Sequence, residues 1–303
     1  MKYLILFPDN KNQTCKPIRI RQMLQYMTAR LAGLFVLGCF ISSCSRPENL
    51  SIAGSTTVLP VISVAAERYQ LANPGLSILV NAGGSGVGVN QLGNGAIDIG
   101  MISRNITIDE IASYPDVNFI VHAIGKDAVV PVVSSEIHAA GVTALSLGNI
   151  ASIYLGEIQN WRELGGPDRD ILVVDKEQSR GTRHVFMEAV MGDEEALAPG
   201  ADLVLGSNNE EQTAIVQSDS AIGMLSHAWL NDDVVGLSVI LGDGSIIEPT
   251  LANIINDSYP ITRDLLLVTN GQPQDFAADF IAFIFSTEGQ TIVEENGYVA
   301  LDR

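Results

Sequence analysis

The sequence predicts an α/β protein in which helices cover both faces of mostly parallel sheets, arranged as two doubly wound lobes with a ligand cleft between them. Apolar, strand-like runs alternate with helix-like segments from residue 50 to residue 285. Glycine-rich turns lead from strand to helix, and 303 residues are enough for two domains of ordinary size. The most informative stretch runs from Gly83 to Arg104 and reads GGSGVGVNQLGNGAIDIGMISR.

The first elements follow a β-α-β-α-β pattern. Strands are expected at 50–53, 76–81 and 97–102, and helices at 58–71 and from Ser85 to the breaker Gly93-Asn94-Gly95. The helix N-termini that follow Gly54 and Gly84 should therefore lie side by side at the carboxyl edge of a parallel sheet. Open α/β sheets bind their ligands at that edge.

The remaining elements continue the alternation. Strands are expected at 117–124, 128–133, 171–174, 221–225 and 265–269, and helices at 146–154, from Thr182, at 209–217 and at 274–285. The strand at 128–133 should carry the chain into the second lobe, and the strand at 265–269 should lead it back. The aromatic residues of the last helix recur at helical spacing, which is typical of a core face.

Glycine-rich turns before helices favour anion binding. The turns let several backbone N–H groups point at one anion, and the helix dipole adds roughly half a positive charge there. A third junction of this kind, DKEQSRGTRHVF, begins at Asp175. The alternative is that these turns are only tight connections. The spacing matches neither the dinucleotide fingerprint G-x-G-x-x-G nor a P-loop.

The N-terminal region predicts export and lipidation. An apolar segment at 31–41 follows Arg30 and ends at Ser42-Ser43-Cys44, which fits a secretory signal and is short for a membrane span. ISSC resembles the bacterial lipobox, so residues 1–44 are expected to be a signal peptide with lipidation at Cys44. Cys39, in VLGC, is a competing match, and an uncleaved N-terminal anchor is the structural alternative.

The net charge argues against two classes of main partner. Six of the 17 basic residues and one of the 35 acidic residues lie in residues 1–44, so 11 basic and 34 acidic residues remain. The exported part would carry a net charge near −23, which disfavours nucleic acid or an anionic membrane surface as the main partner. A small anion is still compatible, because surface charge is screened beyond about 8–10 Å.

Seven motifs together resemble the phosphate-binding proteins of ABC transporters. They occur in the family's order and cover nearly everything after Leu50: GSTTVLP, GGSGVGV, AIDIGMISR, IYLGEIQNWRELGG, RGTRHVF, AIGMLS and YPITRDLLLVTNGQP with the following FIAFIFSTEGQTIVEENGYV. The resemblance implies a type II periplasmic-binding-protein fold, with lobe 1 formed by 45–126 and 268–303 and lobe 2 by 127–267. It also implies an extracytoplasmic monomer that delivers inorganic phosphate to ABC permease subunits.

The same resemblance implies a set of ligand-binding residues. They are Thr56, Thr57, Val58, Ser85, Asp98, Lys176, Arg180, Gly181 and Thr182. The third junction departs from the family pattern Arg-x-x-x-Ser-Gly-Thr, because Lys176 replaces the arginine and Arg180 replaces the serine. We expect the Arg180 guanidinium to enter the cleft and to replace the missing clamp. The alternative is that Arg180 points to solvent or pairs with Glu177.

Asp98 suggests how the ligand is selected. A carboxylate repels an anion unless the anion brings a proton to share. Phosphate near neutral pH still carries one, since its second pKa is on the order of 6–7. Sulfate carries none and would leave a buried Asp98 unpaired. Asp98 should therefore favour a protonated oxyanion; the alternative is that it is a solvated or capping acid.

The sequence gives little support for an enzymatic function. The four histidines have no metal-binding spacing, no G-x-S-x-G elbow occurs, and the exported part contains no cysteine nucleophile and no close carboxylate pair. His184 is expected to be exposed or capping. We expect no cofactor, no metal and no catalysis. Two functional alternatives stay open: a binding protein for another tetrahedral oxyanion, and a surface lipoprotein that senses phosphate without transporting it.

Overall fold

The structure, a computed structural model, describes residues 48–301. The expected signal peptide and Cys44 lie outside these residues. Among the described residues, no helix is both long enough and apolar enough to cross a bilayer.

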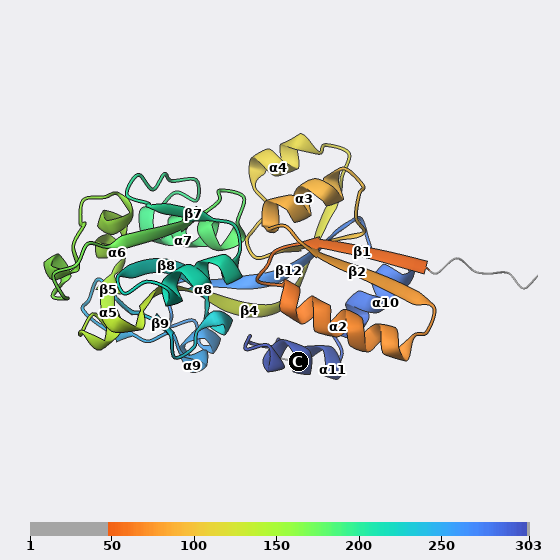
Figure 1. Ribbon diagram of the computed structural model, residues 1–303. Helices are drawn as coiled ribbons and strands as arrows, with labels where there is room; N and C mark the ends of the chain where they lie inside the picture. The colour runs from red at the N-terminus through yellow and green to blue at the C-terminus, as the bar shows by residue number, and fades with distance from the viewer. Residues whose placement is uncertain (1–47, 302–303) are drawn as a thin grey trace, which may run out of the picture. The chain divides into compact units, whose positions relative to one another are not determined.

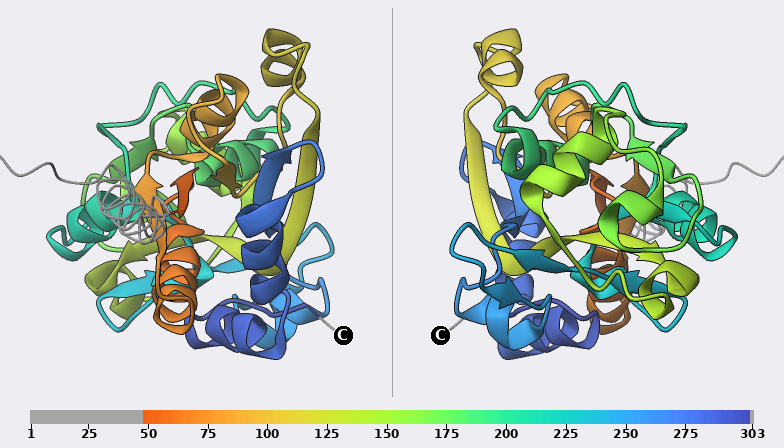
Figure 2. Two further views of the ribbon diagram at one scale, coloured as in Figure 1. Left: turned by 90° about the vertical axis from the view of Figure 1, so that its right-hand side faces the viewer. Right: turned by 90° about the vertical axis from the view of Figure 1, so that its left-hand side faces the viewer.

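The elements of the first lobe come from both ends of the described chain. They are β1 (Glu48–Gly54), α2 (Leu59–Ala72), β2 (Leu76–Ala82), α3 (Ser85–Gly93), β3 (Ile99–Ile102), α4 (Ile108–Ser113), the first half of β4 (Phe119–Ser134), β12 (Thr262–Asn270), α10 (Asp275–Ile284) and α11 (Thr287–Glu295). Figure 2 shows α2, in orange, beside the blue C-terminal helices, and Tyr69 of α2 packs against Phe280 of α10 with ring centroids 5.6 Å apart.

The second lobe is formed by the chain between β4 and β12. Its helices are α5 (Ser135–Ala139), α6 (Leu147–Tyr154), α7 (Gly181–Met191), α8 (Asn208–Val216) and α9 (Leu251–Ile255), with 3-10 turns η2 (Trp161–Leu164) and η3 (His227–Trp229). Its strands are β5 (Ala144–Ser146), β6 (Leu172–Lys176), β7 (Leu203–Leu205), β8 (Ala221–Ser226), β9 (Val234–Gly236), β10 (Ser238–Ile240) and β11 (Ile246–Ile247).

The main sheet has the strand order β2-β1-β3-β12-β4-β8-β6-β7, with β9 pairing to β4. Strand β1 pairs in parallel with β2 and β3, so the turns after these three strands meet at one sheet edge, as the β-α-β-α-β pattern predicts. The 16-residue β4 combines the two strands expected at 117–124 and 128–133. It pairs antiparallel with β12, and the two strands connect the lobes (Figure 1).

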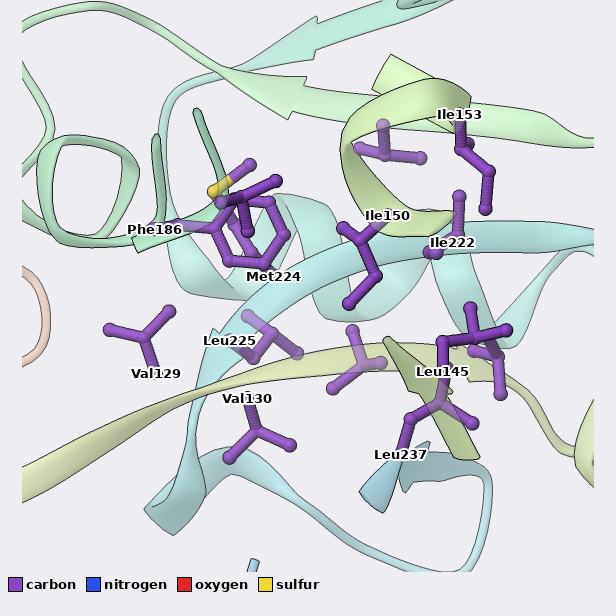
Figure 3. Packing of buried hydrophobic residues seen from close by; sticks show 14 of the residues in the cluster. Val129, Val130, Leu145, Ile150, Ile153, Phe186, Ile222, Met224, Leu225 and Leu237 are labelled. Carbon is purple, nitrogen blue, oxygen red and sulfur yellow. The ribbon is translucent and has the colours of Figure 1, made fainter. Parts of the chain in front are cut away.

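Each lobe has its own hydrophobic core. The larger cluster takes its buried residues from Ala128 to Ile261, and Figure 3 labels side chains of it from β4, β5, β8 and the helices α6 and α7. Two further clusters take theirs from Leu50 to Ile124 and from Leu265 to Tyr298. The cores therefore separate within the two crossing strands. The fold class expected from the sequence is confirmed.

Candidate anion-binding site

A small polar cavity lies where the two lobes meet. Twelve residues line it, nearly all from loops and helix starts at strand ends: Ser55, Thr56, Thr57, Gly84, Ser85, Ser103, Lys176, Arg180, Gly181, Thr182, Gly206 and Asn208. Only about 10 Å³ of the cavity is open to the centre of a water molecule, which is room for roughly one water. The surrounding side chains are therefore already in contact with one another.

Lobe 1 contributes two adjacent strand-to-helix turns. The Gly84 amide donates to the Gly54 carbonyl at 2.8 Å, which joins the turn after β2 to the turn after β1. Both glycines have positive φ, 139° at Gly54 and 98° at Gly84. A Cβ on Gly54 would lie 2.1 Å from the Met101 carbonyl oxygen, so the close approach of β1 to β3 requires glycine here.

Three buried serines of lobe 1 form one hydrogen-bonded group. Ser55 Oγ donates to Ser103 Oγ at 3.0 Å, and the Ser103 amide donates to Ser85 Oγ at 3.1 Å. Each serine follows a different strand: β1, β2 or β3. Because parallel strands end at the same edge, residues up to 48 positions apart in the sequence become neighbours.

Lobe 2 meets these turns through the N-terminus of α7. The Gly86 amide of α3 donates to the Ser179 carbonyl at 3.0 Å, which is a direct hydrogen bond between the lobes. A Cβ on Gly181 would lie 2.4 Å from Ser85 Oγ and 2.6 Å from Ser103 Oγ. Glycine at position 181 is thus what lets α7 approach the serines of lobe 1 this closely.

A buried ion pair on the crossing strands lies beneath the cavity. Arg263 of β12 and Asp127 of β4 are register partners, and their side chains are 2% and 1% exposed. Asp127 accepts from Arg263 Nε at 3.0 Å and Nη2 at 2.8 Å, and from Ser226 Oγ at 2.8 Å. Arg263 also reaches both lobes: Nη1 donates to Thr182 Oγ1 at 3.0 Å, and Nη2 donates to Thr57 Oγ1 at 3.2 Å.

Lys176 lies at the end of β6 and is almost fully buried. It forms an ion pair with Glu211 of α8 and donates to Asn208 Oδ1 at 3.1 Å. Burial lowers the pKa of Lys176 and raises the pKa of Glu211, and the attraction between the two groups opposes both shifts. The lysine charge is therefore neutralised locally by Glu211, and Lys176 lines the cavity beside Asn208.

Arg180 lies at the boundary between the cavity and solvent. Its guanidinium forms an ion pair with Glu177 on the same loop, as the alternative interpretation expected. It nevertheless lines the cavity and contacts Gly84 of lobe 1, where a Cβ would lie 2.9 Å from Arg180 Cδ. An open groove of about 420 Å³ outside the cavity shares Thr56, Arg180 and Gly206 with it. Arg180 thus separates the cavity from this groove.

The structure brings seven of the nine expected site residues together. These are Thr56, Thr57, Ser85, Lys176, Arg180, Gly181 and Thr182. Val58 is different, because its side chain is fully buried in the lobe 1 core. The sequence interpretation missed Ser55, Ser103 and Asn208, and the pair Arg263–Asp127 beneath them. In the sequence, Lys126-Asp127 comes just before the apolar run 128–133 and Arg263-Asp264 just before the run 265–269, so no local pattern singled out this pair.

The structure contradicts the placement of Asp98 in the cleft. Strand β3 begins at Ile99, so Asp98 precedes the strand, while the cavity lies at its carboxyl end beside Ser103. Five strand residues span roughly 16 Å. Asp98 is exposed and accepts hydrogen bonds from the Ser51 amide and hydroxyl, both at 2.7 Å. Of the alternatives, a solvated or capping acid, the first describes it: Asp98 is exposed and bonds Ser51, 47 positions away in the sequence.

His184 also differs from its expectation. It is 7% exposed, and burial together with the nearby Arg104 charge lowers its pKa. It lies outside the cavity, 3.6 Å from a Glu194 carboxylate oxygen. Within residues 48–301, no group of three His, Cys, Asp or Glu side chains is arranged to hold a metal ion.

Comparisons with known proteins identify the family of the chain. Residues 42–288 match the PBP superfamily domain. The phosphate-binding protein PstS of Bacillus subtilis is 32% identical over 253 residues, which are 83% of this chain and 80% of that protein. The PstS of Borreliella burgdorferi is 31% identical over 271 residues, which are 86% of this chain and 93% of that protein.

Solved structures show the same similarity. A putative phosphate ABC transporter substrate-binding protein from Clostridium perfringens, with bound phosphate, has a TM-score of 0.75 and 33% identity, covering 84% of this chain and all of that one. An ABC-type phosphate transport receptor from Vibrio cholerae has a TM-score of 0.67 and 30% identity, covering 83% and 100%. The fold is thus the type II periplasmic-binding-protein fold, and the chain belongs to the PBP superfamily and, within it, to the family of PstS phosphate-binding proteins.

Proposed function

We propose that this protein captures inorganic phosphate in the cavity between its lobes and delivers it to an ABC permease. The observation that carries the proposal is the convergence of hydrogen-bond donors from both lobes on one closed cavity. Lobe 1 contributes the hydroxyls of Thr57 and Ser85. Lobe 2 contributes the hydroxyl of Thr182 and the side-chain amide of Asn208. Arg263 joins the two sets from below. Many donors around one small space suit a tetrahedral oxyanion.

The cavity also implies that the lobes separate to admit the ligand. Phosphate has four oxygen atoms, each about as large as a water molecule, and the closed cavity has room for roughly one water. The contacts that must break include the hydrogen bond from the Gly86 amide to the Ser179 carbonyl and the one from Asn208 Nδ2 to Thr57 Oγ1. The crossing strands β4 and β12 are where a hinge would act.

Calorimetric titration of the purified protein with phosphate tests this function directly. We expect one phosphate per chain. Thr182→Ala should weaken binding by roughly tenfold or more, because it removes a hydroxyl that bonds Arg263 and faces the cavity. Thr213→Ala is the matched control, because Thr213 is an exposed threonine whose hydroxyl bonds only within α8. Absence of phosphate binding by the unmodified protein would refute the function.

The membrane anchor and the permease are part of the same proposal. Acylation at Cys44 would hold the protein at the membrane that contains the permease, outside the cytoplasm. Mass spectrometry should find diacylglycerol on Cys44, and acylation on Cys39 would contradict this. Phosphate-dependent stimulation of the permease ATPase in proteoliposomes would distinguish transport from sensing alone.

We also infer binding without catalysis. The relatives compared above are named as binding or transport proteins. The cavity holds hydroxyls and cations whose charges are already paired, and no general base faces it among the described residues. The protein should therefore leave a chromogenic phosphate monoester intact, and enzyme-dependent release of phosphate would overturn this inference.

A further inference from the structure

The crossing strands contain an irregularity at the boundary between the lobes. Ile124 belongs to the lobe 1 core and Ala128 to the lobe 2 core. Between β4 and β12 the register shifts by one residue here, since Leu265 faces Gly125 while Leu266 faces Ala123. A bulge of this kind bends a strand locally. Residues 124–127 of β4 are therefore where the strand can bend between the lobes.

The segment 297–301 is fastened to β4 at this point. The Lys126 amide donates to the Val299 carbonyl at 2.8 Å, and the Val299 amide donates back to the Lys126 carbonyl at 2.9 Å. A Cβ on Gly125 would lie 3.0 Å from the Val299 carbonyl oxygen, so the segment also covers the neighbouring residue closely. Bending of β4 at this point must carry the segment along or break these bonds.

The same segment contacts both lobes. On the lobe 1 side, Gln290 of α11 donates Nε2 to the Ile124 carbonyl at 3.1 Å and accepts from the Leu301 amide at 2.8 Å. On the lobe 2 side, Gly297 packs against Ala228 of η3, because a Cβ on this glycine would lie 3.3 Å from Ala228 Cβ. The segment therefore lies at the hinge itself and is not simply the end of lobe 1.

Tyr298 extends from this segment to the loop that holds Thr57. Its side chain is buried, and its hydroxyl donates to the Thr57 carbonyl at 2.7 Å. Burial raises the pKa of Tyr298, and the nearby Asp127 carboxylate raises it further, so the phenol keeps its proton and can donate. Tyr298 does not line the cavity and thus contacts Thr57 from outside it.

Thr57 is where lobe 1 reaches lobe 2 across the cavity. Its Oγ1 accepts from Asn208 Nδ2 and from Arg263 Nη2, both at 3.2 Å, and lies 3.4 Å from Thr182 Oγ1. Asn208 and Thr182 belong to lobe 2, and Arg263 belongs to the crossing strand β12. The backbone of Thr57 is thus bonded to the hinge segment, while its side chain makes the contacts between the lobes.

We propose that Tyr298 is a positioning residue whose hydroxyl couples bending of the hinge to the placement of Thr57, so that closing the lobes also fixes the ligand loop. The inference rests on the proposed function and assigns a role to a residue outside the cavity. A contact changes ligand affinity only if it differs between the open and the closed state. The bond from Tyr298 to Thr57 should therefore be stronger in the closed, ligand-bound protein.

Tyr298→Phe tests the coupling, because it removes only the hydroxyl. We expect the phosphate affinity, measured by calorimetric titration of the full chain, to fall about five- to tenfold. Tyr154→Phe is the matched control, since the Tyr154 hydroxyl donates to the Val174 carbonyl at 2.9 Å in the lobe 2 core. It should lower the unfolding temperature similarly and leave the phosphate affinity within about twofold. Equal affinity losses in the two variants, or none in Tyr298→Phe, would show that Tyr298 acts only through stability.

Amide hydrogen exchange at Lys126 and Val299 measures the coupling at the hinge. Each of these amides donates to the carbonyl of the other residue, so exchange requires that the segment separates from β4. Phosphate should slow this exchange in the unmodified protein, and saturating phosphate should slow it less in Tyr298→Phe. Equal slowing in the two proteins would overturn the inference and leave the proposed function intact. Absence of phosphate binding by the unmodified protein would overturn the proposed function, and this inference with it.

Discussion

Replacing Arg180 by serine tests whether the cation at the cavity mouth contributes to ligand binding. The Arg180 side chain is 16% exposed and lines both the cavity and the outer groove. A hydrogen bond from a charged group contributes about 1.5–3 kcal/mol. Its present partner, Glu177, is 52% exposed, and an ion pair at such a surface is worth about 1 kcal/mol at most. Exchange of Glu177 for a ligand oxygen should therefore be favourable.

The expected magnitude follows from these terms. Arg180→Ser should weaken phosphate binding by about ten- to a hundredfold, since each 1.4 kcal/mol corresponds to tenfold. Glu177→Gln should strengthen binding by up to about fivefold, because it releases the guanidinium from its competing partner. Calorimetric titration measures both. The double variant should resemble Arg180→Ser, since the glutamate acts only through the arginine.

Arg162→Ser provides the matched control. Arg162 is 65% exposed and pairs with Asp168 away from the cavity, so its loss removes the same charge without touching the site. If Arg180→Ser binds phosphate as tightly as the unmodified protein, or if Arg162→Ser loses as much affinity, then Arg180 is only a surface residue and the reasoning fails.

Three further outcomes are expected. Asp98→Asn should leave the phosphate affinity within about twofold, because Asp98 bonds Ser51 far from the cavity. A larger loss of affinity, measured by calorimetry, would show that Asp98 belongs to the binding site. Asp127→Asn should lower the free energy of unfolding in urea by about 3–5 kcal/mol, because it leaves Arg263 buried without its counter-charge; a smaller loss would mean that the pair is dispensable. The pKa of His184 is lowered in the folded protein, mainly by burial, so the unfolded state binds more protons as pH falls below about 6.5 and stability should decrease there. His184→Gln should reduce this decrease in thermal melts between pH 7 and 5, and an unchanged decrease would contradict the role given to His184.

Local sequence patterns predicted the longer strands and helices, which are marked by their own residues. They missed the helices α4, α5, α9 and α11 and the short strands β5, β7, β9, β10 and β11. Apolar runs identified the strands β1, β2 and β8, and glycines marked the turns that follow β1 and β2. The start of strand β3 decided whether Asp98 was placed correctly relative to the cavity. The strand expected at 97–102 begins at Ile99, which puts Asp98 at the amino end of β3 and the ligand-side position at Ser103. The motif around Asp98 does not specify which end of the strand faces the ligand.

The pair Arg263–Asp127 could not be found from local patterns. Its two residues are 136 positions apart, and they face each other only because β12 and β4 pair in one particular register. In the sequence, each residue lies just before an apolar run and beside a second charged residue, so neither stands out. Their role at the floor of the cavity depends on side-chain hydrogen bonds to Thr57 and Thr182, which no spacing in the sequence encodes.

The crossing strands also constrain the order in which the chain folds. Lobe 2 is one continuous segment between β4 and β12, so it can fold as soon as that segment is available. Lobe 1 needs β12 to complete the sheet beside β3, and α10 and α11 to cover α2, so it must wait for the C-terminal end of the chain. Contacts between such distant segments form slowly, because a long loop must close first. As the chain is synthesised, the β1–β2–β3 segment would therefore emerge first yet complete its native contacts last, and would be the part most exposed to proteases and chaperones.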